Sequence, residues 1–451
     1  MRNVTFTLFT VLAALQVLTA QPCWTSIAAG ELHTVALGAN GQIWSWGGNN
    51  VGQLGNGNLF PVLTPIQTGT DSNWCQISAG RLHTVAIKTD GTLWAWGNNA
   101  SGELGDGTNT NRSVPVQIGT DTNWHTVSAG GFHTAAIKTN GTLWTWGRNA
   151  DGELGHGNVT SSNVPVQVGT DTDWMAIACG LFHMAGIKTN NTLLAWGNNP
   201  NGEVGDSTTT DRSLPVAIYG GGSWIAVSAG AAHTAAINTS GQLWSWGFNA
   251  YGQIGNGANT NCLAPVQENS GNTWLSLSAK GNHTLAIATG NTLWAWGDNT
   301  YSQLGNGSTT WSNVPLQTGN NTANWQLAVS DLNHSAALQA DGSIWLCGDG
   351  YYGQMGNGTN QGLAVFSTIA CPFSTVVVQA PQAAMPQLYP NPAGDVVRIS
   401  NLPAGEVVRI YSAAGQLLLT ANAPREIAVH ALSPGVYVVR AGAHTWRLVK
   451  L

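Results

Sequence analysis

The 451-residue sequence has little charge, because Lys, Arg, Asp and Glu together make up 8 % of it, against about a quarter in ordinary soluble proteins. Its net charge of −6 argues against the basic stripe of a nucleic-acid-binding protein, so we expect no nucleic-acid partner. Beyond the N-terminus, no apolar run approaches the ~18 residues of a membrane-spanning helix, so we expect no transmembrane segment. None of the six cysteines stands in a Cys-x-x-Cys pair, and no other spacing indicates a metal site.

Glycine and tryptophan are abundant instead, with 57 and 21 residues. Many aromatic residues and little charge argue against intrinsic disorder, which requires the opposite balance. A chain rich in Gly, Thr and Asn is typical of many short strands joined by tight turns.

The first residues resemble an export signal. Arg2 precedes the apolar stretch Phe6–Leu18, and Ala20 offers a small residue at a cleavage site. We therefore expect residues 1–20 to be a signal peptide, with a buried strand or helix as the alternative interpretation. The chain after residue 20 is then exported.

The middle of the chain consists of seven copies of one unit of about 50 residues. One histidine marks each copy: His33, His83, His133, His183, His233, His283 and His334. One tryptophan opens each copy: Trp24, Trp74, Trp124, Trp174, Trp224, Trp274 and Trp325. A Trp-x-Trp pair, a Gly-x-Leu-Gly segment and a late proline also recur, with the pair damaged in the fourth and seventh copies.

A single copy predicts four strands. Trp74–Ala79, His83–Ile87, Thr92–Trp96 and Val114–Ile118 are apolar or alternating segments, and Asp90-Gly91 is a hairpin-turn pair. Four strands cannot bury their faces alone, whereas a closed ring of such sheets buries them all. The fold class is therefore all-β: a seven-bladed β-propeller over residues 21–371, with the tryptophans packed between blades.

The motifs support a family resemblance. Ala79-Gly80-Arg81-Leu82-His83-Thr84, Leu93-Trp94-Ala95-Trp96-Gly97 and Gly102-Glu103-Leu104-Gly105 resemble the regulator of chromosome condensation repeat. The resemblance implies a seven-bladed propeller. Eukaryotic members of that family act as guanine-nucleotide exchange factors and contact chromatin.

The repeated residues are interpreted as structural. Seven equivalent histidines indicate a structural role, in which each imidazole ring forms a hydrogen bond with a backbone group at a blade junction. A catalytic or metal site would instead need unlike residues converging on one point. Cys23 and Cys371 lie where the ring would close, so we expect a disulfide between them. The other four cysteines are expected to be mostly buried thiols.

Function is expected where the copies differ. Alternating strand direction brings the Gly-x-x-His turn and the loop after the Trp pair to one face, where Lys280 and Asp331 also replace repeat glycines. Aromatic residues gather on that face and form the candidate binding site: Phe132, Phe182, Phe248, Tyr251, Tyr301, Trp311, Tyr351 and Tyr352. Packing of these rings between loops is the alternative interpretation.

The C-terminal region differs in composition. Residues 21–385 carry eight basic and 18 acidic residues, whereas residues 386–451 carry six and three. Residues 372–386 are expected to be a linker. Residues 387–451 contain Tyr389-Pro390-Asn391-Pro392 and alternating strands such as Gly435-Val436-Tyr437-Val438, and they resemble the C-terminal sorting domain of the type IX secretion system. An ordinary β-sandwich adhesion module is the alternative.

The resemblance implies a small β-sandwich, the type IX secretion machinery as a partner, and a protein that is secreted or attached to a Bacteroidetes-type outer membrane. No nucleophile, zinc-protease or phosphate-binding motif is present, and nothing implies a cofactor. We therefore favour a binding module for an extracellular protein or glycan. A carbohydrate-active hydrolase with a site in the central funnel is the alternative, and a guanine-nucleotide exchange factor is the third hypothesis.

Overall fold

The computed structural model describes residues 23–218, 220, 222–268, 270–319, 323–372, 387–389, 393–400, 402, 406–422, 426–442 and 444–451. The expected signal peptide and nearly all of the expected linker lie outside these residues. The chain divides into two compact units, with the boundary between Thr375 and Val376. Among the described residues, no helix is long and apolar enough to span a membrane.

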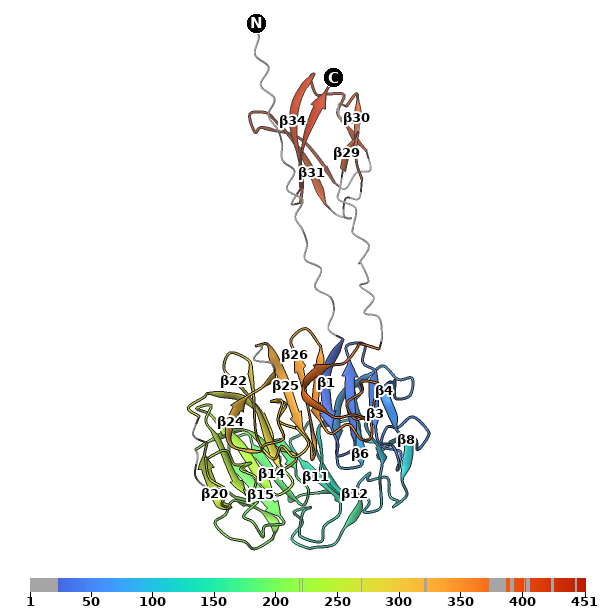
Figure 1. Ribbon diagram of the computed structural model, residues 1–451. Coiled ribbons are helices and arrows are strands. Elements are labelled where there is room, and N and C mark those ends of the chain that lie inside the picture. Colours follow the sequence, from blue (N-terminus) through green and yellow to red (C-terminus); the bar gives the residue numbers. More distant parts are fainter. Residues whose placement is uncertain are drawn as a thin grey trace. The chain divides into compact units, whose positions relative to one another are not determined.

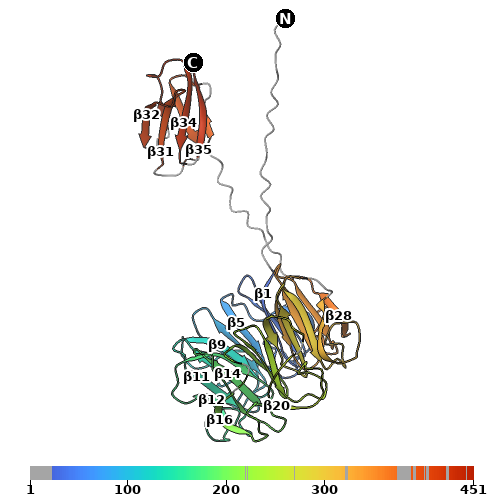
Figure 2. The same ribbon diagram turned by 90° about the vertical axis from the view of Figure 1, so that its left-hand side faces the viewer.

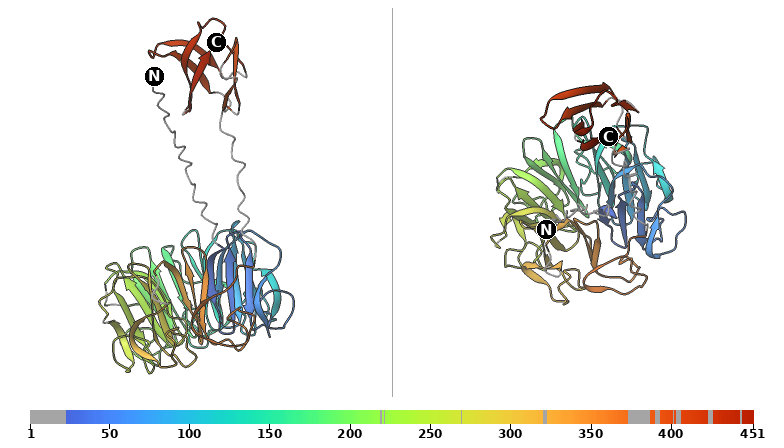
Figure 3. Two further views of the ribbon diagram at one scale, coloured as in Figure 1. Left: turned by 45° about the horizontal axis from the view of Figure 1, so that its top comes forward. Right: turned by 90° about the horizontal axis from the view of Figure 1, so that it is seen from above.

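The described part of the first unit is a seven-bladed β-propeller, as the repeat count predicts. Its strands form seven four-stranded antiparallel sheets, and each sheet uses four strands in chain order. Figure 2 shows the first strands of blades one to three, β1, β5 and β9, side by side. Figure 1 and the right panel of Figure 3 show how the last blade returns to the first, so that β26 lies beside β1.

The first four blades have the following strands. Blade one holds β1 (Trp24–Ala29), β2 (His33–Gly38), β3 (Ile43–Gly47) and β4 (Val62–Gln67). Blade two holds β5 (Trp74–Ala79), β6 (His83–Lys88), β7 (Leu93–Gly97) and β8 (Arg112–Gln117). Blade three holds β9 (Trp124–Ala129), β10 (His133–Lys138), β11 (Leu143–Gly147) and β12 (Ser162–Gln167). Blade four holds β13 (Trp174–Cys179), β14 (His183–Lys188), β15 (Leu193–Gly197) and β16 (Arg212–Ala217).

The remaining three blades repeat this order. Blade five holds β17 (Trp224–Ala229), β18 (His233–Asn238), β19 (Leu243–Gly247) and β20 (Cys262–Gln267). Blade six holds β21 (Trp274–Ser278), β22 (His283–Ala288), β23 (Thr292–Gly297) and β24 (Ser312–Gln317). Blade seven holds β25 (Trp325–Ser330), β26 (His334–Gln339), β27 (Ile344–Gly348) and β28 (Leu363–Thr368).

Local sequence explains the architecture of each blade. In blade two, Gly91 takes a φ of 76° in the turn between β6 and β7, a conformation that glycine adopts without strain. Pro115 lies on β8, the outer edge strand, where a missing N–H costs no sheet hydrogen bond. The two middle strands of each blade are almost wholly buried, whereas the fourth strand is mostly half-exposed.

Tryptophan rings fill the space between sheets. In blade two, Trp74 meets Trp94 and Trp96 at centroid distances of 5.9 and 6.1 Å, both in edge-to-face geometry. Trp96 is fully buried, and a buried indole contributes about 4–6 kcal/mol of gross hydrophobic free energy. The small residue between the pair, Ala95, is buried against the opposite neighbour, as expected.

Each blade junction is built on one carbonyl group. The Gln53 carbonyl of blade one accepts hydrogen bonds from the Thr84 hydroxyl at 2.9 Å and from the Trp96 indole N–H at 3.0 Å. Because that hydroxyl donates to the carbonyl, its oxygen accepts from the Nε2–H of His33, 3.0 Å away. Equivalent histidine–hydroxyl contacts join six of the seven junctions: His33–Thr84, His83–Thr134, His183–Thr234, His233–Thr284, His283–Ser335 and His334–Thr34.

The expected role of the histidines is structural, but the expected partner is wrong. At six junctions the ring contacts a hydroxyl on the next blade rather than a backbone group, since Thr and Ser supply both a donor and an acceptor. The junction between blades three and four is the exception. There Met184 of blade four occupies the hydroxyl position, and neither ring nitrogen of His133 on blade three has a hydrogen-bond partner.

The ring closes between blades seven and one. Cys23 and Cys371 form the expected disulfide, with their Cα atoms 6.1 Å apart. The Trp46 indole donates to the Gln354 carbonyl at 2.9 Å, and Thr34 contacts His334 at 3.2 Å, so this junction repeats the one between blades one and two. The remaining four cysteines are free; Cys179 and Cys347 are buried, whereas Cys75 is exposed and Cys262 half-buried, so burial was predicted correctly for two of them.

The second unit is a small all-β domain. Its described strands are β29 (Gln387–Tyr389), β30 (Val396–Ser400), β31 (Val407–Ser412), β32 (Leu417–Asn422), β33 (Ile427–Ala428), β34 (Gly435–Ala441) and β35 (His444–Lys450). They form a three-stranded sheet, β29-β30-β33, and a four-stranded sheet, β32-β31-β34-β35. Val397, Ile410, Val439 and Leu448 are buried between them in one apolar core.

Removing a junction hydroxyl should destabilise the propeller. Thr84→Val keeps the side-chain shape but leaves the His33 Nε2–H without an acceptor, so we expect a loss of about 1–3 kcal/mol in the free energy of unfolding. Met184→Leu is the matched control, since that junction has no hydroxyl and the swap should cost under about 1.5 kcal/mol. Denaturant titration measures the free energy of unfolding of both variants. Equal stability of T84V and the parent would contradict a stabilising role of the Thr84 hydroxyl at the junction.

The propeller should also be sensitive to acid. Burial lowers the pKa of the junction histidines from 6.5 to about 3 or 4, so the unfolded chain binds protons that the folded chain does not. The free energy of unfolding therefore has its full value above pH 6.5. It falls as the pH drops towards 4, by up to about 1.4 kcal/mol per histidine and pH unit. Denaturant titrations at pH 7 and pH 5 test this; a free energy of unfolding that does not fall between them would show the prediction to be wrong.

Candidate functional site

Two sets of loops form one face of the propeller, which we call the loop face. The first set follows the first strand of each blade, and the second set joins the third strand to the fourth. Backbone bonds connect them, as from the Gly48 amide to the Leu32 carbonyl at 2.7 Å and from the Phe248 amide to the Ala232 carbonyl at 2.8 Å. The sequence-based placement of both sets on one face agrees with this geometry.

Aromatic side chains occupy equivalent loop positions on three successive blades. Tyr251, Tyr301 and Tyr352 are 39 %, 50 % and 38 % exposed. Phe248 packs edge-on against Tyr251 at 6.1 Å, and Tyr351 against Tyr352 at 4.9 Å. Together with Trp311 these residues form the aromatic arc: Phe248, Tyr251, Tyr301, Trp311, Tyr351 and Tyr352.

Trp311 replaces a residue that closes the loop in other blades. In blades two and five, Asn111 and Asn261 accept a hydrogen bond from a backbone amide of the same loop at 2.9 and 3.0 Å. An indole has no acceptor, so blade six lacks this bond and instead presents a ring that is 45 % exposed. Loop closure therefore does not explain the presence of this tryptophan.

Phe132 and Phe182 belong to a different cluster. Their rings stack at 5.6 Å with an interplanar angle of 14°, and both are half-buried. The guanidinium of Arg81 lies 5.1 Å from the Phe132 ring, and that of Arg148 lies 4.7 Å from the Phe182 ring. Guanidinium–ring packing accounts for these two phenylalanines, so the predicted set divides into this cluster on blades two to four and the aromatic arc on blades five to seven.

Sequence reasoning missed Phe60. It is 75 % exposed in the long loop of blade one, next to Pro61, which lines a groove with Tyr351 and Tyr352. The equivalent residue is Thr in blades two to six, so the same criterion of a broken repeat would have identified it. The closed ring adds that the neighbouring Pro61 lies in one groove with Tyr351 and Tyr352 of blade seven.

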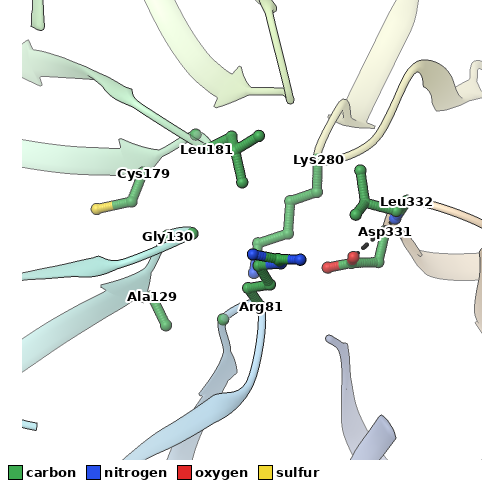
Figure 4. A pocket seen from close by; sticks show the side chains of 11 residues that line it. Arg81, Ala129, Gly130, Cys179, Leu181, Lys280, Asp331 and Leu332 are labelled. Carbon is green, nitrogen blue, oxygen red and sulfur yellow. Dashed lines mark hydrogen bonds between the residues drawn. The ribbon is translucent and has the colours of Figure 1, made fainter. Parts of the chain in front are cut away.

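A pocket at the central channel contains the two replaced glycines. Figure 4 shows the Arg81, Lys280 and Asp331 side chains converging from blades two, six and seven. Elsewhere this position needs glycine, since a Cβ on Gly80 would lie 2.5 Å from the Gly130 carbonyl oxygen. In blade six the close approach is taken by Gly281, which frees Lys280 to reach across and donate to the Ala79 carbonyl of blade two.

The charges in this pocket perturb one another. Burial raises the pKa of Asp331 to about 7, against the opposing effect of Lys280, and burial lowers the pKa of Lys280. One Asp331 oxygen accepts the Leu332 amide at 2.7 Å. Among the described residues that line the pocket, Asp331 is the one carboxylate; Glu31 forms an ion pair with Arg81 instead.

The described residues contain no group of three His, Cys, Asp or Glu side chains that could hold a metal ion. Tyr389 of the sorting motif ends β29, while Pro390, Asn391 and Pro392 lie outside the described residues.

Comparison with known proteins identifies both parts of the chain. Family models described as the RCC1-like domain and the regulator of chromosome condensation repeat match residues 63–385 and 24–53. A model of the secretion system C-terminal sorting domain matches residues 387–450. No curated protein matches the sequence.

Solved structures with the propeller fold include human WBSCR16 and yeast Prp20p. Human WBSCR16 is 20 % identical, with a TM-score of 0.64 over 70 % of this chain and 87 % of that one. Prp20p from Saccharomyces cerevisiae is 21 % identical, with a TM-score of 0.65 over 74 % and 87 %. The chain belongs to the RCC1-like domain family, and its C-terminal type IX sorting domain makes it a secreted or outer-membrane surface-attached protein of Bacteroidetes type.

Proposed function

We propose that the propeller is a binding module that holds an extracellular partner on its loop face, through the aromatic arc. The observation that carries this proposal is the exposure of five arc rings, at 38–68 %, on consecutive blades. Exposed aromatic residues with few charges are the usual centre of a binding surface, because they lose much water-accessible area at a small entropic cost.

The channel pocket gives limited support to the hydrolase alternative. Asp331 has the raised pKa of a general acid, but glycoside hydrolysis uses a pair of carboxylates about 5–10 Å apart. The neighbours of Asp331 in the pocket are Lys280 and Arg81, which suit a buried charge cluster rather than paired acid and base. We therefore place binding before catalysis.

Nucleotide exchange is the least supported function. Binding to Gsp1p and histones is a property of the yeast protein Prp20p. At 21 % identity, the similarity supports a shared fold but not a shared function. An exported propeller meets neither a cytosolic GTPase nor chromatin, so export removes the setting in which such an activity would operate.

Loss of the arc should abolish capture without unfolding the protein. The triple variant Tyr251→Ala, Tyr301→Ala and Trp311→Ala removes three exposed rings, and each change should alter stability by less than about 0.5 kcal/mol. The purified full chain, immobilised and incubated with culture fluid and cell-surface material, should retain a bound component that the variant fails to retain. Melting temperature and bound material are both measured.

The control variant carries Val159→Ala, Met175→Ala and Leu214→Ala, which remove similar exposed apolar area from blades three and four. It should capture as well as the parent. Undiminished capture by the arc variant would reject the arc as the binding surface, as would equal loss in both variants.

A further inference from the structure

Charge is distributed unevenly around the ring. The variable residue of the Gly-x-Leu-Gly segment is at most 2 % exposed in every blade. It is Glu in blades two to four and Gln in the other blades: Glu103, Glu153, Glu203, Gln253, Gln303, Gln354 and Gln53.

The fold accepts either residue at this position. The Glu103 carboxylate accepts the Ser101 amide at 2.7 Å, and the Gln303 amide oxygen accepts the Tyr301 amide at 2.9 Å. Burial raises the pKa of Glu103, so the carboxylate is the more costly choice. Loop geometry therefore does not decide between charge and neutrality.

A second loop position follows the same division except in blade three, where it is His156. Three residues further on, blades two and four carry Asp106 and Asp206, which pair with Arg112 and Arg212 at 2.7 and 2.5 Å. Blades five, six, seven and one carry asparagine there: Asn256, Asn306, Asn357 and Asn56. The long loops of the loop face thus form a charged half on blades two to four and a neutral half on the rest, and the aromatic arc lies on the neutral half.

The long loops of the neutral half carry little charge, whereas Glu31, Lys280 and Asp331 of the same blades lie in the short turns. These long loops, residues 248–261, 298–311, 349–362 and 48–61, contain no Lys, Arg, His or Glu. Their two acidic residues bond within their own loops: Asp298 accepts from the Gln303 amide group at 3.1 Å, and Asp349 from that of Gln354 at 3.1 Å. The arc is therefore surrounded by amide and hydroxyl groups rather than ions.

One groove shows this chemistry in detail. At the junction of blades seven and one, Tyr351 and Tyr352 face Pro61 and Leu63 across a groove that holds about 700 Å³. Thr359 and Asn360 complete its described lining, and no charged side chain contributes to that lining. The groove offers two aromatic rings beside a hydroxyl and an amide.

We infer that the aromatic arc binds a neutral glycan, an inference that rests on the proposed binding function. The apolar C–H face of a sugar ring packs on an aromatic ring, and its hydroxyls pair with Asn, Gln, Ser and Thr side chains without burying a charge. Five exposed rings on consecutive blades suit an extended chain of sugars better than a single sugar.

The neutral half fits other ligand classes less well. An acidic polysaccharide would need cations to offset its carboxylates or sulfates, and the long loops of the arc carry none. A protein partner usually brings charged rim residues, and the long loops of the arc offer them no Lys, Arg, His or Glu. The lack of basic residues in the long loops and their many amide and hydroxyl groups together favour a neutral glycan as the ligand.

Affinity electrophoresis tests the inference directly. The purified full chain is run in native gels containing a soluble neutral polysaccharide (β-glucan, mannan, xylan or galactan) or an acidic one (alginate or polygalacturonate). We expect at least a twofold reduction in relative mobility in one or more neutral gels and none in the acidic gels. Tyr301→Ala should restore the mobility, Tyr301→Phe should keep most of the retardation, and Leu275→Ala, exposed on the same blade, should behave as the parent.

Full mobility in every neutral gel would overturn the glycan inference, as would retardation that Tyr301→Ala leaves unchanged. The capture experiment separates this failure from failure of the proposed function. Captured material that resists periodate, which cleaves sugar diols, but is lost after protease would make the partner a protein; the arc would still be a binding site, and the glycan inference would be wrong.

Discussion

The propeller depends on one carbonyl group at each blade junction. At six of the seven junctions that carbonyl accepts a hydrogen bond from a hydroxyl of the next blade, whose oxygen contacts a buried histidine, and in most blades it also accepts one from an indole N–H. The groups that make this bond are the residues that recur every 50 positions, which explains why histidine, threonine and tryptophan are repeated while the loops vary. Because the junction uses neutral groups, the protein needs few charges to hold the ring together.

The repeat made the fold predictable from the sequence. Spacing of Trp24, His33 and their equivalents gave the number of blades, and the position of Cys23 and Cys371 indicated where the ring closes. The partner of each histidine was not predictable, because a contact between residues 51 positions apart is seen only once the blades are arranged around the axis. Phe60, by contrast, breaks the repeat and could have been found by sequence, whereas the groove that its neighbour Pro61 forms with Tyr351 and Tyr352 exists only in the closed ring.

The candidate site was predictable in part. The rule that function lies where copies differ found Tyr301 and Trp311, which break a repeat position and are exposed. It also selected Phe132 and Phe182, whose exposure is limited by stacking between Arg81 and Arg148. Composition alone could not separate the two groups, because their difference lies in which neighbouring blade supplies a cation. The division of the loop face into charged and neutral halves likewise appears only when equivalent positions are compared around the ring.

Two kinds of residue therefore share one scaffold: the repeated residues hold the blades together, and the exposed rings of the aromatic arc, at positions that vary among the copies, face outward. Hydrogen exchange of the full chain, with and without the material that it captures, tests this division most directly. The account predicts slower amide exchange in the long loops of blades five to seven and of blade one, with the loop at residues 148–161 unchanged. Slower exchange confined to blades two to four, or to the opposite face, would contradict it.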